Sequence, residues 1–262
     1  IIFDYVHLLK KAPLAEYYYQ EKQAIADLSF LFHEKVAPLD SVCQLVINMQ
    51  HYPLEDYIFG DYVMDGLCQT SIDELLSYLS SDNMRIIHIS QQPYHHNADH
   101  FDQTSFWYQV PYHVEKIATD KLNHWQNHLA VQSAKQALCL PAKNPYIIAN
   151  PQVLANEKNY LLPELIYDAS GINIWYKQDV TFKVPKGHIY VGIDSPVTVA
   201  NPKNIAMTRL FVDLYSDAVV EENYDAELAG IHYHLYAHQG GITLQLAGIS
   251  EKQPKLLTCL LA

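Results

Sequence analysis

The chain has 262 residues, 49% hydrophobic and 18% charged, so it is long enough to bury a core and is neither disordered nor supercharged. Its formal net charge of −12 argues against nucleic acid as the main partner, because phosphate binding requires a cationic surface. No apolar run approaches the ~20 residues of a membrane-spanning helix. Four scattered cysteines without a C-x-x-C pair exclude a zinc ribbon or a disulfide-dense scaffold.

The first ninety residues predict several helices and one strand. The spacing of Phe3, Val6 and Leu9 predicts a helix that Pro13 ends, and a second helix is expected from Leu14 toward Phe32. A third helix, over 39–50, has one apolar face made of Val42, Leu45, Val46 and Met49.

The next elements lie between residues 71 and 90. Ser71 and Glu74 form a capping-box pattern in front of a fourth helix. A polar turn at 80–83 follows, and Met84–Ser90 predicts a buried strand.

Residues 91–155 differ from the sequence on either side. Prolines punctuate this stretch, histidines are frequent in it, and one short helix is expected near 120–129. Periodicity is otherwise weak, which predicts a long connector between two folded parts.

Strands dominate the rest of the chain, with expected strands at 172–177 and 188–194. Asn201–Pro202 predicts the start of a long helix that ends at Gly230. The apolar face of this helix is expected to contain Met207, Leu210, Phe211, Leu214, Tyr215 and Ala218. Segments 231–237 and 242–249 then flank Gly240–Gly241, a hairpin signal.

These elements predict an α+β fold with two incomplete layers, each an antiparallel or mixed sheet with helices on one face, joined by a long linker. Because the chain begins and ends inside predicted helices, we expect it to be an excerpt of a longer polypeptide.

The sharpest candidate for metal chemistry is the segment His124-Trp125-Gln126-Asn127-His128. Two histidines four residues apart share one helix face and could both reach a zinc ion. The inverted zinc-peptidase motif H-x-x-E-H needs a glutamate where this chain has Asn127, and the direct motif H-E-x-x-H needs one where it has Trp125. Without a base next to the histidines, we interpret the segment as an exposed helix and not as a catalytic centre.

Two further groups of histidines could also be either functional sites or ordinary polar surface. His95, His96 and His100, with Asp99 and Asp102 nearby, could bind zinc or nickel, but a solvated loop is the simpler interpretation. The third group, His232, His234 and His238, alternates along a predicted strand and would form either a pH-sensitive patch or the polar face of that strand, and the polar face is favoured.

No complete catalytic site follows from the residues. The nucleophile-elbow pattern G-x-S-x-G is missing from the sequence, and no cysteine lies in a motif that ties it to a base. The paired carboxylates Glu221–Glu222 are expected at a helix end in solvent. We therefore assign no catalytic residue, no metal ligand and no substrate-binding residue.

Several collinear segments resemble the pitrilysin/insulinase family of zinc metallopeptidases. Residues 224–230, the hairpin up to Gly248 and residues 252–254 are similar to the opening of the third family domain, as are 174–179 and 182–186. Upstream, 52–55 and the stretch through Asn83 and Ile89 resemble the end of the second domain. Residues 125–127 and 140–144 are similar to the interdomain linker.

The resemblance implies a chamber built from two closable halves, each with two α+β domains, and a zinc site in the first domain, outside this segment. It divides the chain into the end of domain two (1–91), the interdomain linker (92–155) and the start of domain three (156–262). On this reading no cofactor belongs to the segment itself.

The implied function is a non-catalytic central part of a peptide-degrading enzyme, with peptides and the other domains of the same chain as partners. Exposed sheet edges also predict self-association of the isolated segment. Two alternatives stay open: a stand-alone binding or structural module, and an independent metalloenzyme that uses its own histidines. Analogy with bacterial family members favours a periplasmic location, with a cytoplasmic one as the alternative.

Overall fold

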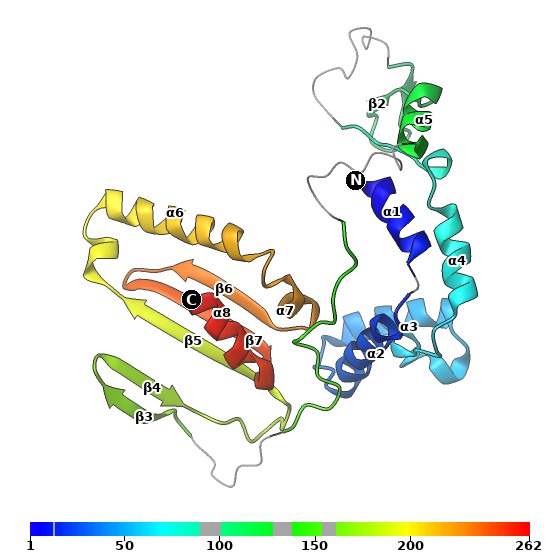
Figure 1. Ribbon diagram of the computed structural model, residues 1–262. Helices are drawn as coiled ribbons and strands as arrows, with labels where there is room; N and C mark the ends of the chain where they lie inside the picture. The colour runs from blue at the N-terminus through cyan, green and yellow to red at the C-terminus, as the bar shows by residue number, and fades with distance from the viewer. Residues whose placement is uncertain (13, 90–100, 128–137, 154–160) are drawn as a thin grey trace. The chain divides into compact units, whose positions relative to one another are not determined.

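The protein is described here by a computed structural model that covers residues 1–12, 14–89, 101–127, 138–153 and 161–262 (Figure 1). The chain forms two compact units, residues 1–16 with 66–142 and residues 17–65 with 143–262. The division at 1–91, 92–155 and 156–262 remains a prediction, because compactness does not define the domains of a family.

The first unit is mainly helical. It contains α1 (Ile2–Lys11), α4 (Gln69–Tyr78), η3 (Ser81–Asn83), the short strands β1 (Gln103–Thr104) and β2 (Pro111–Tyr112), and α5 (Thr119–Asn127). The Lys10 ammonium donates to the Leu79 carbonyl oxygen at 3.1 Å and so fastens the end of α1 to the end of α4. The predicted helices over 1–12 and near 120–129 are confirmed for the described residues.

Two predictions in this unit are wrong. The helix α4 begins at Gln69 with Cys68 as its N-cap, so Ser71 lies inside the first turn, where its hydroxyl donates to the Cys68 sulfur at 3.1 Å. Residues 84–89 of the predicted strand are not in a strand, and Ile86, Ile87 and Ile89 are exposed. Apolar residues alone do not make a strand, since its backbone groups need a neighbouring strand to pair with. Ser90 lies outside the described residues.

The second unit opens with the predicted helices α2 (Glu16–Leu31) and α3 (Pro38–His51), followed by η1 (Leu54–Asp56) and η2 (Gly60–Tyr62). The predicted apolar face of α3 is exposed along its length. The buried residue of α3 is Asn48, whose amide donates to the Tyr57 carbonyl oxygen at 2.9 Å. A buried polar side chain must find such a partner, and here the hydrogen bond ties the η1 turn back to the helix.

The main sheet contains three antiparallel strands in the order β5-β7-β6: β5 (Lys186–Asp194), β7 (Gly241–Ile249) and β6 (His232–Ala237). The hairpin of β6 and β7 and the strand β5 are where the sequence predicts them. A separate hairpin joins β3 (Glu164–Ala169) and β4 (Ile172–Tyr176). Its turn residues Ser170 and Gly171 both have positive φ, as a two-residue hairpin turn of type I′ requires. Only the second of these two strands was expected.

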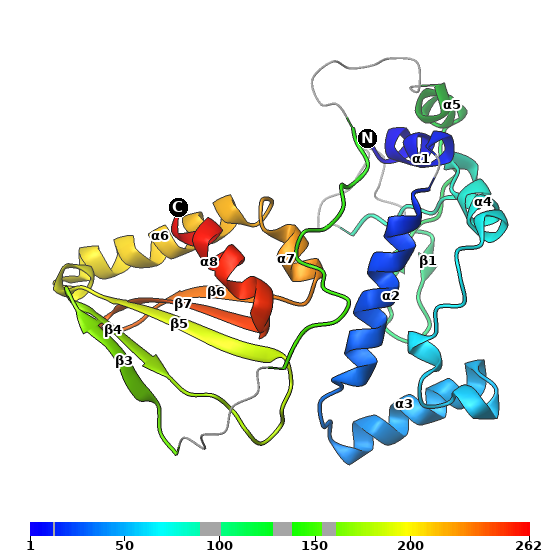
Figure 2. The same ribbon diagram turned by 60° about the horizontal axis from the view of Figure 1, so that its bottom comes forward.

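Helices cover one face of the main sheet (Figure 2). They are α6 (Pro202–Val219), preceded by η5 (Pro196–Val199), then α7 (Tyr224–Leu228), and α8 (Gln253–Leu261), preceded by η6 (Ser250–Lys252). Helices and sheet enclose a core of Tyr146, Val212, Ala226, Ile231, Leu235, Leu244, Leu246, Leu256 and Leu260. The fold is α+β with antiparallel sheets, as predicted. No helix in the described ranges is both long and apolar enough to cross a membrane.

The orientation of α6 differs from the prediction. Met207, Leu210, Phe211, Leu214 and Ala218 are exposed, whereas Val212, Tyr215 and Val219 pack on the sheet. The helix is apolar on two sides, so its bulkiest stripe does not identify the side that meets the sheet. Its predicted N-cap is confirmed, because the Asn201 side chain accepts from the Asn204 N–H at 2.9 Å.

Gly230 terminates α7 and not the long helix α6. Its φ is +75°, its N–H donates to the Glu227 carbonyl, and the Ile231 N–H donates to the Ala226 carbonyl. These two bonds are the Schellman pattern that a glycine in the left-handed region allows. The bend directs the chain from α7 straight into β6.

Candidate functional site

The histidine pair predicted at 124 and 128 is described only in part. His124 is exposed on α5, and His128 lies outside the described residues. Next to His124, the Trp125 ring stacks on Phe3 with centroids 6.3 Å apart and an interplanar angle of 25°. Gln126 donates from its amide to an Asp82 carboxylate oxygen at 2.7 Å. The helix α5 is therefore fastened to α1 and η3 by these two side chains.

The second histidine group, His95, His96 and His100 with Asp99, lies entirely outside the described residues. Asp102, at its edge, is described, and one of its carboxylate oxygens lies 2.9 Å from His113 Nδ1. The hydrogen bond to His113 lowers the pKa of the Asp102 carboxyl. Within the described ranges, no three His, Cys, Asp or Glu side chains are grouped closely enough to hold a metal ion.

The third histidine group is divided, because His232 and His234 lie on the outer face of β6, whereas His238 lies close to α6. His232 and His234 are exposed on β6, and His238 follows the end of that strand. His232 Nδ1 is 2.5 Å from a Glu227 carboxylate oxygen, and the His234 ring stacks on Tyr236 at 5.5 Å. The alternation was predicted correctly, and the arrangement is that of a polar outer face. Glu221 and Glu222 are exposed in the turn after α6.

A buried polar cluster that no catalytic or metal motif predicted lies around Asn144, at the end of the connector. Asn144 is 7% exposed, and its backbone N–H donates to a Glu21 carboxylate oxygen at 2.8 Å. Its side-chain amide donates to the Asp225 carbonyl at 2.7 Å and accepts from the Tyr146 N–H at 2.8 Å. The backbone and side chain of this one residue thus join α2, the connector and the start of α7.

Tyr146 follows directly and belongs to the core, with 5% of its surface exposed. Its hydroxyl points to the Cys259 sulfur at 3.9 Å, and the Lys255 ammonium lies 4.8 Å from the ring centroid. Burial, followed by the contact with Cys259, raises the pKa of Tyr146 to about 12. The phenol is therefore neutral at physiological pH and acts as a packing group.

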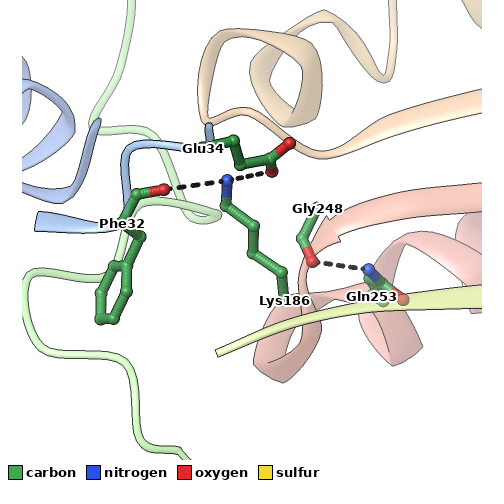
Figure 3. A network of polar contacts seen from close by, with 5 residues as sticks. All are labelled: Phe32, Glu34, Lys186, Gly248 and Gln253. Carbon is green, nitrogen blue, oxygen red and sulfur yellow. Dashed lines mark hydrogen bonds and ion pairs between the residues drawn. The ribbon is translucent and has the colours of Figure 1, made fainter. Parts of the chain in front are cut away.

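A second junction joins the loop after α2 to the first residue of β5 (Figure 3). The Lys186 ammonium lies 2.7 Å from a Glu34 carboxylate oxygen and 3.4 Å from the Phe32 carbonyl oxygen. The hydrogen bond and the positive charge of Lys186 lower the pKa of the Glu34 carboxyl. Because Glu34 is exposed, water screens this ion pair.

The nearby Gln253 is fully buried and holds the same end of the sheet together (Figure 3). Its side-chain amide donates to the Gly187 carbonyl at 2.7 Å and to the Gly248 carbonyl at 2.9 Å. The two acceptors belong to neighbouring strands, so Gln253 anchors α8 to both β5 and β7. No patterned motif marks Gln253 in the sequence beyond its place in the segment 252–254.

These clusters hold backbone segments together and bring no nucleophile next to a base. The comparison with known families decides what kind of segment this is. Residues 30–262 match the domain described as the middle or third domain of peptidase M16. The chain belongs to the M16 peptidase family. The resemblance to pitrilysin/insulinase peptidases is thereby confirmed, with the match falling on a central domain of that family.

Individual relatives agree along nearly the whole M16 segment. It is 30% identical over 266 residues to a nardilysin-like protein of Arabidopsis thaliana, covering 100% of this chain and 25% of that protein. It is 29% identical over 257 residues to human insulin-degrading enzyme, covering 98% and 24%.

A solved structure gives the same result for the fold. The crystal structure of pitrilysin superposes with a TM-score of 0.73 at 26% identity, covering 99% of this chain and 27% of that one. The chain thus spans about a quarter of the length of the relatives it matches.

Proposed function

We propose that the chain is a non-catalytic central segment of a pitrilysin/insulinase-type zinc metallopeptidase that degrades peptides. In this proposal it forms part of the chamber wall and contains the connector between the two halves. The zinc and its ligands belong to another segment of the full-length enzyme. Peptide substrates and the other domains of that enzyme are the partners.

The observation that carries this proposal is the packing and hydrogen bonding of the connector end at Asn144 and Tyr146. A passive tether would leave that end in solvent, whereas here Tyr146 belongs to the core and Asn144 satisfies its polar groups on α2 and α7. The connector is therefore built into the α/β layer at this end. At Trp125 it is also held by a ring contact inside its own unit. When the connector is anchored at both of its ends, a movement of one half of the enzyme is transmitted through it to the other half.

The first test is peptidase activity. The isolated 262-residue chain should not cleave a quenched peptide, with or without added zinc, because no described side chains combine a metal-binding group with a base. Chelator-sensitive cleavage by the pure chain would overturn the proposal and support the independent metalloenzyme.

The second test is Trp125→Ala in the full-length enzyme. Losing one aromatic contact removes about 1 kcal/mol, which changes the ratio of closed to open enzyme by up to about fivefold if that contact exists in one state only. The open fraction can be measured by fluorescence energy transfer or small-angle scattering, together with kcat and KM.

The matched control for this test is Trp107→Ala. Trp107 is also on the connector but is 83% exposed, so its loss should leave the open fraction unchanged. If Trp125→Ala changes neither the open fraction nor the kinetics, the connector is a passive tether.

We propose in addition that other parts of the longer enzyme cover the exposed apolar stripes of α3 and α6. An uncovered stripe of that size favours association. The isolated chain should therefore self-associate in sedimentation velocity, and Phe211→Lys with Leu214→Lys should reduce the association. A strict monomer at high concentration would contradict this.

A further inference from the structure

A surface pocket of about 270 Å³ lies at one end of the sheet layer, where η5 leads into α6 and where the turn between β6 and β7 ends. The N-terminal end of α6 and this turn lie at the same end of the layer (Figure 1). All the lining residues belong to the unit that contains residues 143–262. Apart from His238, the lining residues are outside the histidine groups and the junction clusters.

The walls of the pocket are mainly apolar. Val199, Ile205 and Ala237 line it, together with Thr198 and Thr208. The hydroxyls of those threonines already donate to backbone carbonyls, Thr198 to Ser195 at 2.7 Å and Thr208 to Asn204 at 2.9 Å. The pocket volume is slightly below the ~300–1,000 Å³ of sites that enclose drug-sized ligands. A pocket of this volume suits a single amino-acid residue.

The polar groups of the pocket include three side chains that can donate hydrogen bonds. Arg209 lines it and, among the described residues, makes no hydrogen bond or ion pair. His238 also lines it, and its Nδ1 accepts from the Gly240 N–H at 3.0 Å, which leaves its Nε2–H as a donor. The amide of Gln239 adds a third donor.

No carboxylate lines this pocket, although the chain has 29 acidic residues against 17 basic ones. Asp194 is on β5, and Asp213 lines a neighbouring hollow together with Arg209, but neither carboxylate forms an ion pair with Arg209 within the described part of the chain. A guanidinium without a carboxylate partner, next to a small apolar pocket, is electrostatically complementary to an anion that carries an apolar group.

We propose that this pocket binds the free carboxylate of a C-terminal apolar residue, as at the end of a peptide. The Arg209 guanidinium would hold the carboxylate, and the wall around Ile205 would contact the side chain. The inference does not depend on peptide hydrolysis, so its test uses binding alone and separates it from the failure of the proposed function.

The experiment measures the binding of N-acetyl-leucine to the full-length protein by saturation-transfer difference NMR. N-acetyl-leucinamide, which lacks the charge, should bind about tenfold more weakly or worse, since a hydrogen bond to a charged group is worth about 1.5–3 kcal/mol. Arg209→Ala should produce a loss of the same size. Arg85→Ala removes the other arginine of the chain and should leave binding unchanged.

A second variant tests the apolar wall. Ile205→Ser should reduce the preference for N-acetyl-leucine over N-acetyl-glycine while the carboxylate contact is kept. Circular dichroism and thermal unfolding identify any variant that fails to fold. If Arg209→Ala fails to fold, Arg209→Lys replaces it in the test. This variant keeps the positive charge but lacks the planar guanidinium, so it should bind N-acetyl-leucine more weakly than the wild-type protein but more strongly than it binds the amide.

The proposal would be overturned by equal binding of acid and amide, by unchanged binding to Arg209→Ala, or by displacement by inorganic phosphate with no preference for leucine over glycine. N-acetyl-glutamic acid α-amide, which presents only a side-chain carboxylate, should bind more weakly than N-acetyl-leucine. Binding of equal strength would assign the site to acidic side chains and overturn the C-terminal assignment.

Discussion

The sheet layer (residues 186–262) and the helical region before residue 84 use similar amounts of apolar sequence in different ways. Among the described residues, all the buried hydrophobic side chains are at Tyr146 or beyond it. The helices α1 to α4 bury none, and the apolar face of α3 is exposed. Both regions contain predicted helices, although the long helix expected to end at Gly230 is divided into α6 and α7.

The difference shows that periodicity identifies a face suited to burial and does not supply the surface that buries it. In the sheet layer the partner is local, because β6 presents Leu235, and β7 presents Leu244 and Leu246, to α6 and α8. The stripe on α3 has no comparable partner in the described part of the chain. The comparison can be tested by deleting matched side chains in the two regions.

The largest expected effect is Leu246→Ala, because this residue is fully buried in the core. Truncating a buried leucine costs about 2–5 kcal/mol of the free energy of unfolding. Leu45→Ala, at a position that is 39% exposed on α3, should cost less than about 1 kcal/mol. Denaturant unfolding of both variants gives the two values, and equal losses would show that α3 is buried in solution.

Next in size is Gln253→Ala. The substitution leaves the carbonyls of Gly187 and Gly248 without this donor, and an unsatisfied buried polar group costs about 1–3 kcal/mol. The matched variant Gln239→Ala, in the exposed turn between β6 and β7, should leave stability nearly unchanged. If Gln253→Ala is as harmless as the control, α8 is not anchored through that amide.

A smaller effect at neutral pH, with a distinct pH dependence, is expected for Tyr146→Phe. The native pKa of Tyr146 is raised to about 12 from an ordinary value of 10.0, so its contribution to stability is complete below pH 10 and is lost as the pH rises toward 12. The phenylalanine variant cannot ionise and should be less sensitive over that range. The measurement is the difference in unfolding free energy between the two proteins, and a difference that does not change from pH 9 to 12 would rule out ionisation at this site.

The smallest effect is expected for the ion pair of Lys186 with Glu34. Both side chains are at the surface, so a double-mutant cycle with Lys186→Met and Glu34→Gln should give a coupling close to zero at high salt. The native pKa of Glu34 is lowered, so whatever the pair contributes is present above pH 4.5 and is lost as the pH falls through the lowered pKa. A coupling energy that persists at high salt would show that the ion pair is shielded from water, which contradicts the exposure of Glu34 in this structure.

Sequence reasoning predicted the α+β fold, most helices and the hairpin of β6 and β7, because glycines and caps set local geometry wherever a chain folds. It placed the start of α4 three residues late, because the N-cap position is Cys68, which makes no side-chain cap, and not Ser71. It missed β3, whose exposed residues lack clear alternation, and it assigned the wrong face of α6 to the sheet, since both faces are apolar.

The junction residues Asn144 and Tyr146 were less accessible to such reasoning. Neither residue belongs to a helix or strand, and the partners of Asn144 are 123 and 81 residues away in sequence. No local pattern encodes hydrogen bonds of that range. Family resemblance had marked 140–144 as linker, which gave the place of the junction but not its burial or its contacts.

The order of the strands in the main sheet has a consequence for synthesis. The central strand β7 is paired with β5 over nine residues and with β6 over six, and it is the last of the three to leave the ribosome. Until residue 249 has emerged, β5 has no neighbour and α6 has no complete sheet to cover. The nascent chain therefore holds β5 unpaired from residue 194 to residue 249, and α6 without a complete sheet from residue 219 to residue 249. Unpaired strand edges and apolar surface that are exposed over such an interval favour aggregation.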